Sequence, residues 1–361
     1  MKTFKKAIMI LLSLTALLSA QEKPDRMPVV DIYMFAKITV LVHDENNQPV
    51  DGAKLHIRFS HANGAYNDGY NDFYVQSNRD GKFEAESECM GSIVVEVSKD
   101  GYYASELSYQ PADWSKKYEN GAKLQPWNPT VPIILKKIGK PVPMYVRTGN
   151  REARYFPHQD IEYGFDLIAD DWVAPDGKGT VSDIMLKSEL FVKDKNNHDV
   201  KLTIRFPNKG DGWIPISKLE GVESQLKYPR EAPVAGYLEE PIVFDAEIHK
   251  LSSGDLLKGG HPYGYFIRTR TKLDQNGAVV SALHSKIIDS NLNPPIDQRR
   301  LKNPILFGGS PGDPNDTRIR KGCFFAIDYY LNPKPNDRTL EFDRKTNLAP
   351  EVDREAAAFA P

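Results

Sequence analysis

The stretch that decides the fold is Phe35–Ser60, "FAKITVLVHDENNQPVDGAKLHIRFS". Apolar side chains recur at every second position in two runs, Ile38–Val42 and Leu55–Phe59. Alternation with a period of two gives a strand one buried face and one solvated face. Between the runs, Asp44–Gln48 has the polar composition of a turn. The stretch therefore predicts two β-strands joined by a short connection.

The same character continues along the chain to Ile138. Asp-Gly pairs at Asp80-Gly81 and Asp100-Gly101 predict tight turns, because glycine tolerates positive φ. About seven short strands in a little over 100 residues predict an all-β, Greek-key sandwich over residues 30–138. Two polar, aromatic-bearing segments, His61–Asp72 and Gln110–Pro129, are predicted to be loops.

Three motifs in this region resemble those of the carboxypeptidase regulatory-like, transthyretin-like domains. They occur in the family's order as "VHDENNQPVDGA" (42–53), "SNRDGKFEAE" (77–86) and "VEVSKDGYYAS" (95–105). The resemblance is best over residues 37–107, and it implies a β-sandwich that serves as a spacer or accessory module without catalysis. Asn47 stands where the family has a turn glycine, but asparagine also adopts left-handed geometry.

Residues 139–345 predict a second antiparallel β-sandwich, possibly of the jelly-roll type, which resembles no family that we identify. "KKIGKPVP" (136–143) has the composition of a short hinge. The clearest hairpin bends at Asn276-Gly277. Two long stretches, 207–241 and 290–322, are predicted to be irregular connections.

Both ends of the chain carry their own signals. Residues 1–20 predict a secretory signal peptide, because a basic start is followed by a twelve-residue apolar run, Ala7–Leu18, and small residues. The apolar run is too short for a membrane anchor, and Gln21 stands where a lipoprotein needs cysteine. We therefore expect a periplasmic or extracellular protein that is not a lipoprotein. Residues 346–361 are predicted to be a flexible tail.

Charge and cysteine content exclude several classes of protein. Removal of the predicted signal peptide takes away three lysines and no acidic residue, which leaves 44 basic and 49 acidic residues. A general affinity for nucleic acid needs a basic face and is not expected. Only Cys89 and Cys323 are present, far apart in the sequence. They could form one disulfide or remain two buried thiols, and they cannot form a cysteine zinc site.

No catalytic motif is found. None of the eight histidines belongs to an H-E-x-x-H motif, and neither a G-x-S-x-G elbow nor a P-loop is present. We predict no catalytic residue, no metal and no cofactor. Calcium is possible, but no motif supports it: Asp289–Arg300 begins like an EF-hand loop, and Pro294 and Arg300 occupy the positions of the turn glycine and the bidentate glutamate. "DDWVAPDGKGTVSD" (170–183) is predicted to be a turn between strands, with Trp172 covering the core.

Two groups of side chains are candidates for ligand binding. The first comprises tryptophans that could stack on sugar rings, and the alternative is that they cover sheet edges. The second comprises arginines that could bind anions or acidic glycans, and the alternative is pairing with nearby carboxylates. The candidates are Trp114, Trp127, Trp213, Arg299, Arg300, Arg318 and Arg320.

The sequence thus favours an exported, non-catalytic binding or structural module that engages carbohydrate or a cell-surface partner. It predicts no nucleic-acid partner and no transmembrane segment. An unrecognised secreted glycan-active enzyme and a purely structural envelope protein are the alternatives.

Overall fold

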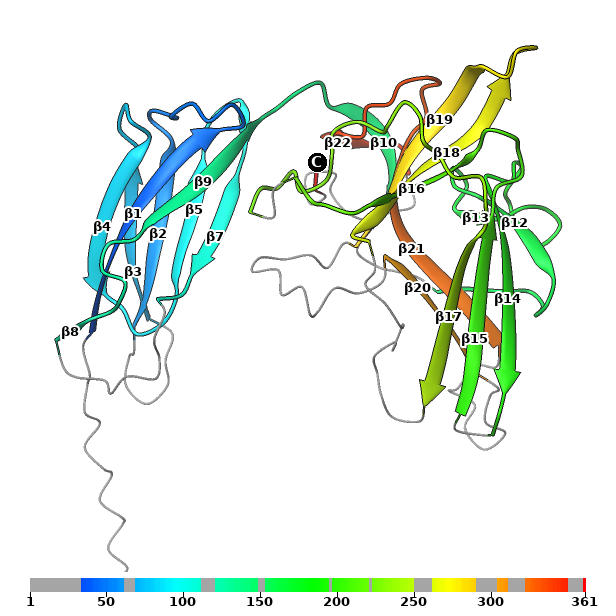
Figure 1. Cartoon of the computed structure of the whole chain (residues 1–361), viewed down its shortest axis with the longest axis horizontal. Coiled ribbons are helices and arrows are strands. Elements are labelled where there is room, and N and C mark those ends of the chain that lie inside the picture. Colours follow the sequence, from blue (N-terminus) through cyan, green and yellow to red (C-terminus); the bar gives the residue numbers. More distant parts are fainter. Residues whose placement is uncertain are drawn as a thin grey trace, which may run out of the picture.

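The structure is a computed structural model, and it describes residues 34–61, 69–111, 121–148, 153–194, 197–220, 223–249, 262–289, 304–310, 322–349 and 360–361. Every named element in these residues is a β-strand. The strands form two domains that lie side by side (Figure 1). The predicted all-β fold is therefore confirmed.

The first domain is a sandwich of two sheets. One sheet has the strand order β4-β1-β9-β6, with β8 paired to β1, and the other has the order β3-β2-β5-β7. The apolar side chains that alternate along β1 and β2, such as Val40 and Ile57, are fully buried between the sheets. The strands are β1 (Met34–Asp44), β2 (Lys54–His61), β3 (Gly69–Gln76), β4 (Lys82–Glu88), β5 (Ile93–Ser98), β6 (Tyr102–Tyr103), β7 (Ser105–Tyr109), β8 (Ala122–Lys123) and β9 (Thr130–Lys137).

Two turns of this domain follow the predicted chemistry. Asn47, between β1 and β2, has a φ of 60°, which is the left-handed geometry expected of it. Gly81, between β3 and β4, has a φ of 71°, and a Cβ atom there would lie 2.2 Å from the carbonyl oxygen of Val42. Only glycine fits at this position. Both loop predictions were too inclusive, because Gly69–Asp72 already belongs to β3 and Ala122–Lys123 forms β8.

The second domain packs two sheets around a larger core. An eight-stranded sheet has the order β16-β18-β19-β21-β10-β22, with β11 and β20 paired to β21, and a five-stranded sheet has the order β13-β12-β14-β15-β17. Phe165, Trp172 and Phe325 meet in edge-to-face contacts in this core. The strands are β10 (Val142–Arg147), β11 (Arg154–Tyr155), β12 (Glu162–Asp166), β13 (Asp171–Trp172), β14 (Ile184–Val192), β15 (Asn197–Arg205), β16 (Gly212–Ile216), β17 (Ile242–His249), β18 (Gly264–Leu273), β19 (Val279–Ile288), β20 (Ile305–Ser310), β21 (Gly322–Asn332) and β22 (Phe342–Asn347).

Two stretches predicted to be irregular contain strands of this sheet. β16 lies within 207–241 and β20 lies within 290–322. Pro215 in β16 and the two glycines of β20 obscure the period-two pattern from which strands are predicted. β22 ends two residues beyond the predicted domain limit at 345, and Leu348 donates a backbone hydrogen bond to Met144, so the predicted tail begins as packed chain.

The second domain extends one sheet of the first. Ser224 forms an antiparallel bridge with Ser105 of β7. The backbone N–H of Glu106 donates to the carbonyl of Glu223 at 2.8 Å, and the N–H of Gln225 donates to the carbonyl of Ala104 at 2.9 Å. We call residues 223–227 the added segment. Its first three residues continue the sheet β3-β2-β5-β7 beyond β7.

A buried carboxylate holds the connection between the domains. Glu341 is 1% exposed, and its Oε1 accepts hydrogen bonds from the Tyr103 hydroxyl at 2.6 Å and from the Gly139 backbone at 2.8 Å. Arg230 lies 3.6 Å from the same carboxylate and forms an ion pair with Glu45 at 2.7 Å. The connection around Gly139, predicted to be a hinge, is therefore fixed by contacts to both domains.

The two cysteines lie in separate cores. Cys89 is buried in the first domain and Cys323 in the second, and both are free. Of the two alternatives left by the sequence, the structure has two buried thiols. Burial raises the pKa of each thiol. Within the described ranges, no helix is long and apolar enough to cross a membrane. The predicted signal peptide lies outside those ranges.

Candidate ligand-binding groove

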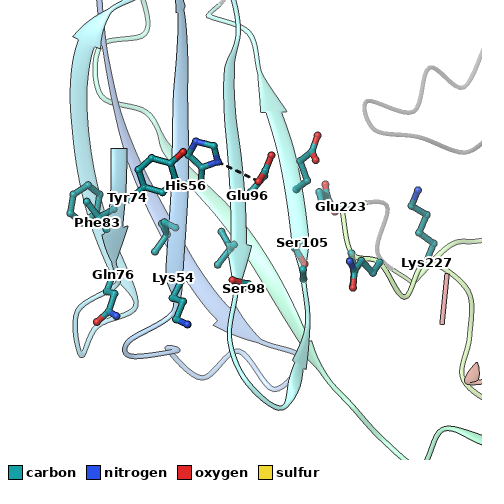
Figure 2. Close-up of a pocket in the computed structure, with 17 residues that line it drawn as sticks. Lys54, His56, Tyr74, Gln76, Phe83, Glu96, Ser98, Ser105, Glu223 and Lys227 are labelled. Carbon is teal, nitrogen blue, oxygen red and sulfur yellow. Dashed lines mark hydrogen bonds and ion pairs between the residues drawn. The ribbon is translucent and has the colours of Figure 1, made fainter. Parts of the chain in front are cut away.

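A groove of about 1130 Å³ lies between the outer face of the sheet β3-β2-β5-β7 and the added segment. Figure 2 shows side chains from adjacent strands standing in rows on this face, with Lys227 on a separate segment beside them. The floor of the groove is a sheet face on which alternate side chains of β3 are exposed.

The period-two pattern of the strands builds this floor. Leu55 and Ile57 of β2 point into the core, so the side chains between them point outward. The strand register then places Tyr74, His56, Glu96 and Glu106 directly opposite one another on neighbouring strands. One row of side chains therefore crosses all four strands of the sheet.

An exposed aromatic ring heads this row. The Tyr74 ring stacks on the His56 ring with a centroid distance of 4.3 Å and an interplanar angle of 10°, yet Tyr74 is 76% exposed. His56 Nε2 lies 2.6 Å from Asp72, and its Nδ1 lies 3.4 Å from Glu96. The imidazole is thus held on both sides, and it supports one face of the tyrosine while the rest of the ring stays open to solvent.

Charges of both signs line the groove. Lys54 and Glu96 line the groove, and Glu96 accepts a hydrogen bond from Arg58 at 2.5 Å. Glu106 and Glu223 stand at the other end of the row, beside Lys227. Burial lowers the pKa of Lys227, and the negative charge of Glu106 opposes this effect. The mixture gives the groove both hydrogen-bond donors and acceptors without a dominant charge.

Neither of the two described tryptophan candidates, Trp127 and Trp213, lines this groove. Trp127 is half-buried beside the other sheet of the first domain, where its neighbour Asn128 donates to the backbone of Lys37, and Lys123 Nζ lies 4.6 Å from its ring centroid. Trp213 packs edge-on against Tyr265 in the second domain and donates from Nε1 to the carbonyl of Glu240 at 2.9 Å. Trp213 is partly buried and packs against the core of the second domain. The candidates Trp114, Arg299, Arg300, Arg318 and Arg320 lie outside the described residues.

The aspartate-rich stretch 170–183 is a turn, as predicted. Trp172 is 5% exposed in the core, and the Ala174 N–H donates to the carbonyl of Gly179. Nearby, Arg270 donates to both carboxylate oxygens of Asp183, at 2.8 and 2.9 Å, and to Asp166 at 3.0 Å. The carboxylates of Asp183 and Asp166 therefore stabilise the backbone through Arg270. Among the described residues, no group of three or more histidine, cysteine, aspartate or glutamate side chains could hold a metal ion.

The residues that form the groove carried only a weak signal in the sequence. In "DFYVQ" (72–76) the alternation points Phe73 and Val75 inward and Tyr74 outward. An outward tyrosine is common on strands, and so is an outward histidine such as His56. Only the strand register, which brings the two rings face to face, distinguishes them.

Comparisons with known proteins identify no family for this chain. No family model matches the chain, and no curated protein matches it, so the resemblance to carboxypeptidase regulatory-like domains stays a prediction. Among solved structures, a candidate carbohydrate-binding protein of Bacteroides uniformis aligns with 8% identity, 81% coverage of this chain, 97% coverage of its own and a TM-score of 0.17. The major pilin subunit of Bacillus cereus aligns with 10% identity, coverages of 72% and 97% and a TM-score of 0.20.

A third structure, 3-chlorocatechol 1,2-dioxygenase of Rhodococcus opacus, aligns with 12% identity and a TM-score of 0.23 over 31% of this chain. The alignment spans 63% of the length of that dioxygenase. Similarities of this strength carry no argument about function.

Proposed function

We propose that the protein binds a neutral glycan in the groove and acts there as a binding module. The observation that carries the proposal is the Tyr74 ring, which is 76% exposed and still held in a fixed plane by its stack on His56. Large aromatic rings are usually buried, because burial removes much apolar area from water. A ring that is exposed and fixed offers a flat surface to the C–H face of a sugar at little cost in side-chain entropy.

The polar side chains around the ring support a neutral ligand. Glu96 is engaged by Arg58 and His56, so the strongest charges on the floor are paired with one another. Sugar hydroxyl groups can donate to carboxylates and accept from lysines, and the groove presents both along its length. A strongly anionic polymer would meet Glu106 and Glu223, which disfavours it.

The proposal is tested by titration of the purified chain against neutral and acidic polysaccharides. Thermal unfolding reports binding, because a ligand at 100 times its Kd adds about 2.7 kcal/mol of stability. We expect a neutral glycan to raise the unfolding midpoint. Tyr74→Ala should abolish this shift without changing the midpoint of the free protein, since the ring is largely exposed, and Tyr74→Phe should retain it.

Two outcomes would favour the alternatives. The first would favour a glycan hydrolase that uses the two acids at one end of the row, Glu106 and Glu223. In that case, reducing ends would appear when the protein is incubated with the glycan, and they would not appear with Glu106→Gln. If no glycan shifted the midpoint and Tyr74→Ala behaved as the wild type, binding at the groove would be excluded and a structural role would remain. Export to the periplasm or cell exterior stays part of the proposal.

A further inference from the structure

The added segment makes the second domain part of the groove, and this has a consequence for the kind of ligand. Along the segment, Ser224 and Leu226 are buried at 2% and 0% exposure, whereas Glu223, Gln225 and Lys227 are more exposed, and all of these residues except Leu226 line the groove. This is the alternation of a strand, with one face turned to the domain interface and the other to the groove. The second domain therefore contributes a strand edge and one wall of the site.

The position of the added segment is fixed by contacts to the first domain. Besides the two backbone hydrogen bonds to β7, the carbonyl of Leu226 accepts a hydrogen bond at 2.9 Å from Lys136, an almost fully buried lysine of β9. Burial lowers the pKa of Lys136, and the nearby Glu220 opposes this effect. An unpaired buried ammonium is costly, so the bond to Leu226 favours a single position of the segment.

The row on the floor runs from Tyr74 to this wall. Glu106 pairs with Glu223 through the backbone, so the row Tyr74, His56, Glu96, Glu106 continues onto the added segment. Four spacings between adjacent strands of about 4.8 Å give the row a length of roughly 19 Å. A single sugar ring would occupy only one end of such a surface.

We propose that the groove takes an extended neutral oligosaccharide that lies across the strands, with one end on Tyr74 and the other against the added segment of the second domain. This inference rests on the proposed function and assigns Gln225 and Lys227 as residues that select for chain length. A monosaccharide or disaccharide contacts the Tyr74 end alone. Only a longer chain contacts both domains.

The experiment uses the full chain and three series of probes, the malto-, cello- and xylo-oligosaccharides of two, four and six units, in isothermal titration calorimetry. We expect the affinity in one series to rise at least tenfold from two to six units. Gln225→Pro removes the N–H that pairs with Ala104, and it should reduce hexasaccharide affinity to the disaccharide level. Gln225→Ala keeps that N–H and loses only the side-chain contacts of Gln225, so its hexasaccharide affinity should fall less than that of Gln225→Pro.

A second variant guards against misfolding of the proline variant. Lys227→Ala alters only a side chain on the wall and should weaken hexasaccharide binding while disaccharide binding stays unchanged. Equal affinity for two and six units, or unaltered hexasaccharide binding in both Gln225→Pro and Lys227→Ala, would overturn the shared site but leave glycan binding at Tyr74 standing. Failure of all three series to bind the wild type would overturn the proposed function together with this extension.

Discussion

The buried histidine His284 makes the stability of the second domain depend on pH. His284 is 5% exposed, and its Nδ1 lies 3.3 Å from the Tyr237 hydroxyl. Burial, together with the positive charges of Arg268 and Arg338, lowers the pKa of His284 from 6.5 to about 4. Between these two values the unfolded chain binds a proton more readily than the folded chain, so stability falls as the pH falls from 6.5 to 4.

We expect His284→Gln to remove this part of the pH dependence. The lowered pKa corresponds to on the order of 3 kcal/mol of stability lost between pH 7 and pH 4. Urea unfolding of the wild type and the variant at the two pH values measures the difference. An equal loss of stability in both proteins would show that His284 is not the group responsible.

A second residue, Arg270, ties two buried carboxylates to a strained backbone position. Its φ is 53°, and the carboxylates of Asp183 and Asp166 that it binds belong to residues that are 0% and 3% exposed. Arg270→Ala should cost about 3–5 kcal/mol, because it leaves buried negative charge without its partner. Arg205 provides a matched control, since it forms an equally well-aligned pair with Glu162 at the surface. Arg205→Ala should cost less than about 1 kcal/mol in the same denaturant titration.

Among the elements, the turn at 171–179 depends on a glycine. A Cβ atom on Gly177 would lie 2.3 Å from the carbonyl oxygen of Trp172 and 2.7 Å from Oδ1 of Asp171. Gly177→Ala should therefore destabilise the second domain by roughly 1–3 kcal/mol, since the turn must move. Lys178→Ala keeps the backbone N–H that donates to Asp171 and should change little. Similar unfolding midpoints for the two variants would show that the turn adjusts without strain.

The strands and turns show how much of the fold could be predicted from the sequence. The alternation of Leu55, Ile57 and Phe59 and the Asn276-Gly277 bend are local signals, and both correctly indicated strands and a hairpin. β16 was not predicted, because proline and glycine interrupt its period-two pattern of apolar residues. The groove could not be predicted from the sequence, because it depends on two long-range pairings that no local pattern encodes. These are the pairing of Tyr74 with His56 and that of the added segment with β7. Trp172 lies in the core of the second domain, as predicted. Trp213, a predicted ligand-binding residue, packs against the same core.

At the scale of the whole molecule, the docking of the two domains depends on Glu341. Its carboxylate joins Tyr103 of the first domain to Gly139 of the connection, and Arg230 lies beside it. Glu341→Ala leaves these groups without their buried acceptor, which favours solvation of the interface and separation of the domains. We expect a larger radius of gyration in small-angle X-ray scattering.

Glu341→Gln is the matched control for this prediction. Its side-chain carbonyl can still accept the hydrogen bonds from Tyr103 and Gly139, although the attraction to Arg230 is lost. We expect the glutamine variant to stay nearer to the wild-type radius than the alanine variant. A wild-type scattering profile for Glu341→Ala would show that the other contacts, such as the added segment and the Arg230–Glu45 pair, hold the domains together.

The parallel pairing of β1 with β9 governs how the first domain would carry mechanical load. The two strands pair from Thr39 with Thr130 to Asp44 with Leu135, and β1 begins the described part of the domain while β9 leads out of it. A pull on the chain at both sides of the domain therefore draws the two strands past each other. All hydrogen bonds of the pair are then loaded in shear at the same moment, rather than opened one after another from an end. The β1–β9 pair therefore opposes tension along the chain across the first domain, and the parallel pair of β10 with β22 has the same arrangement in the second domain.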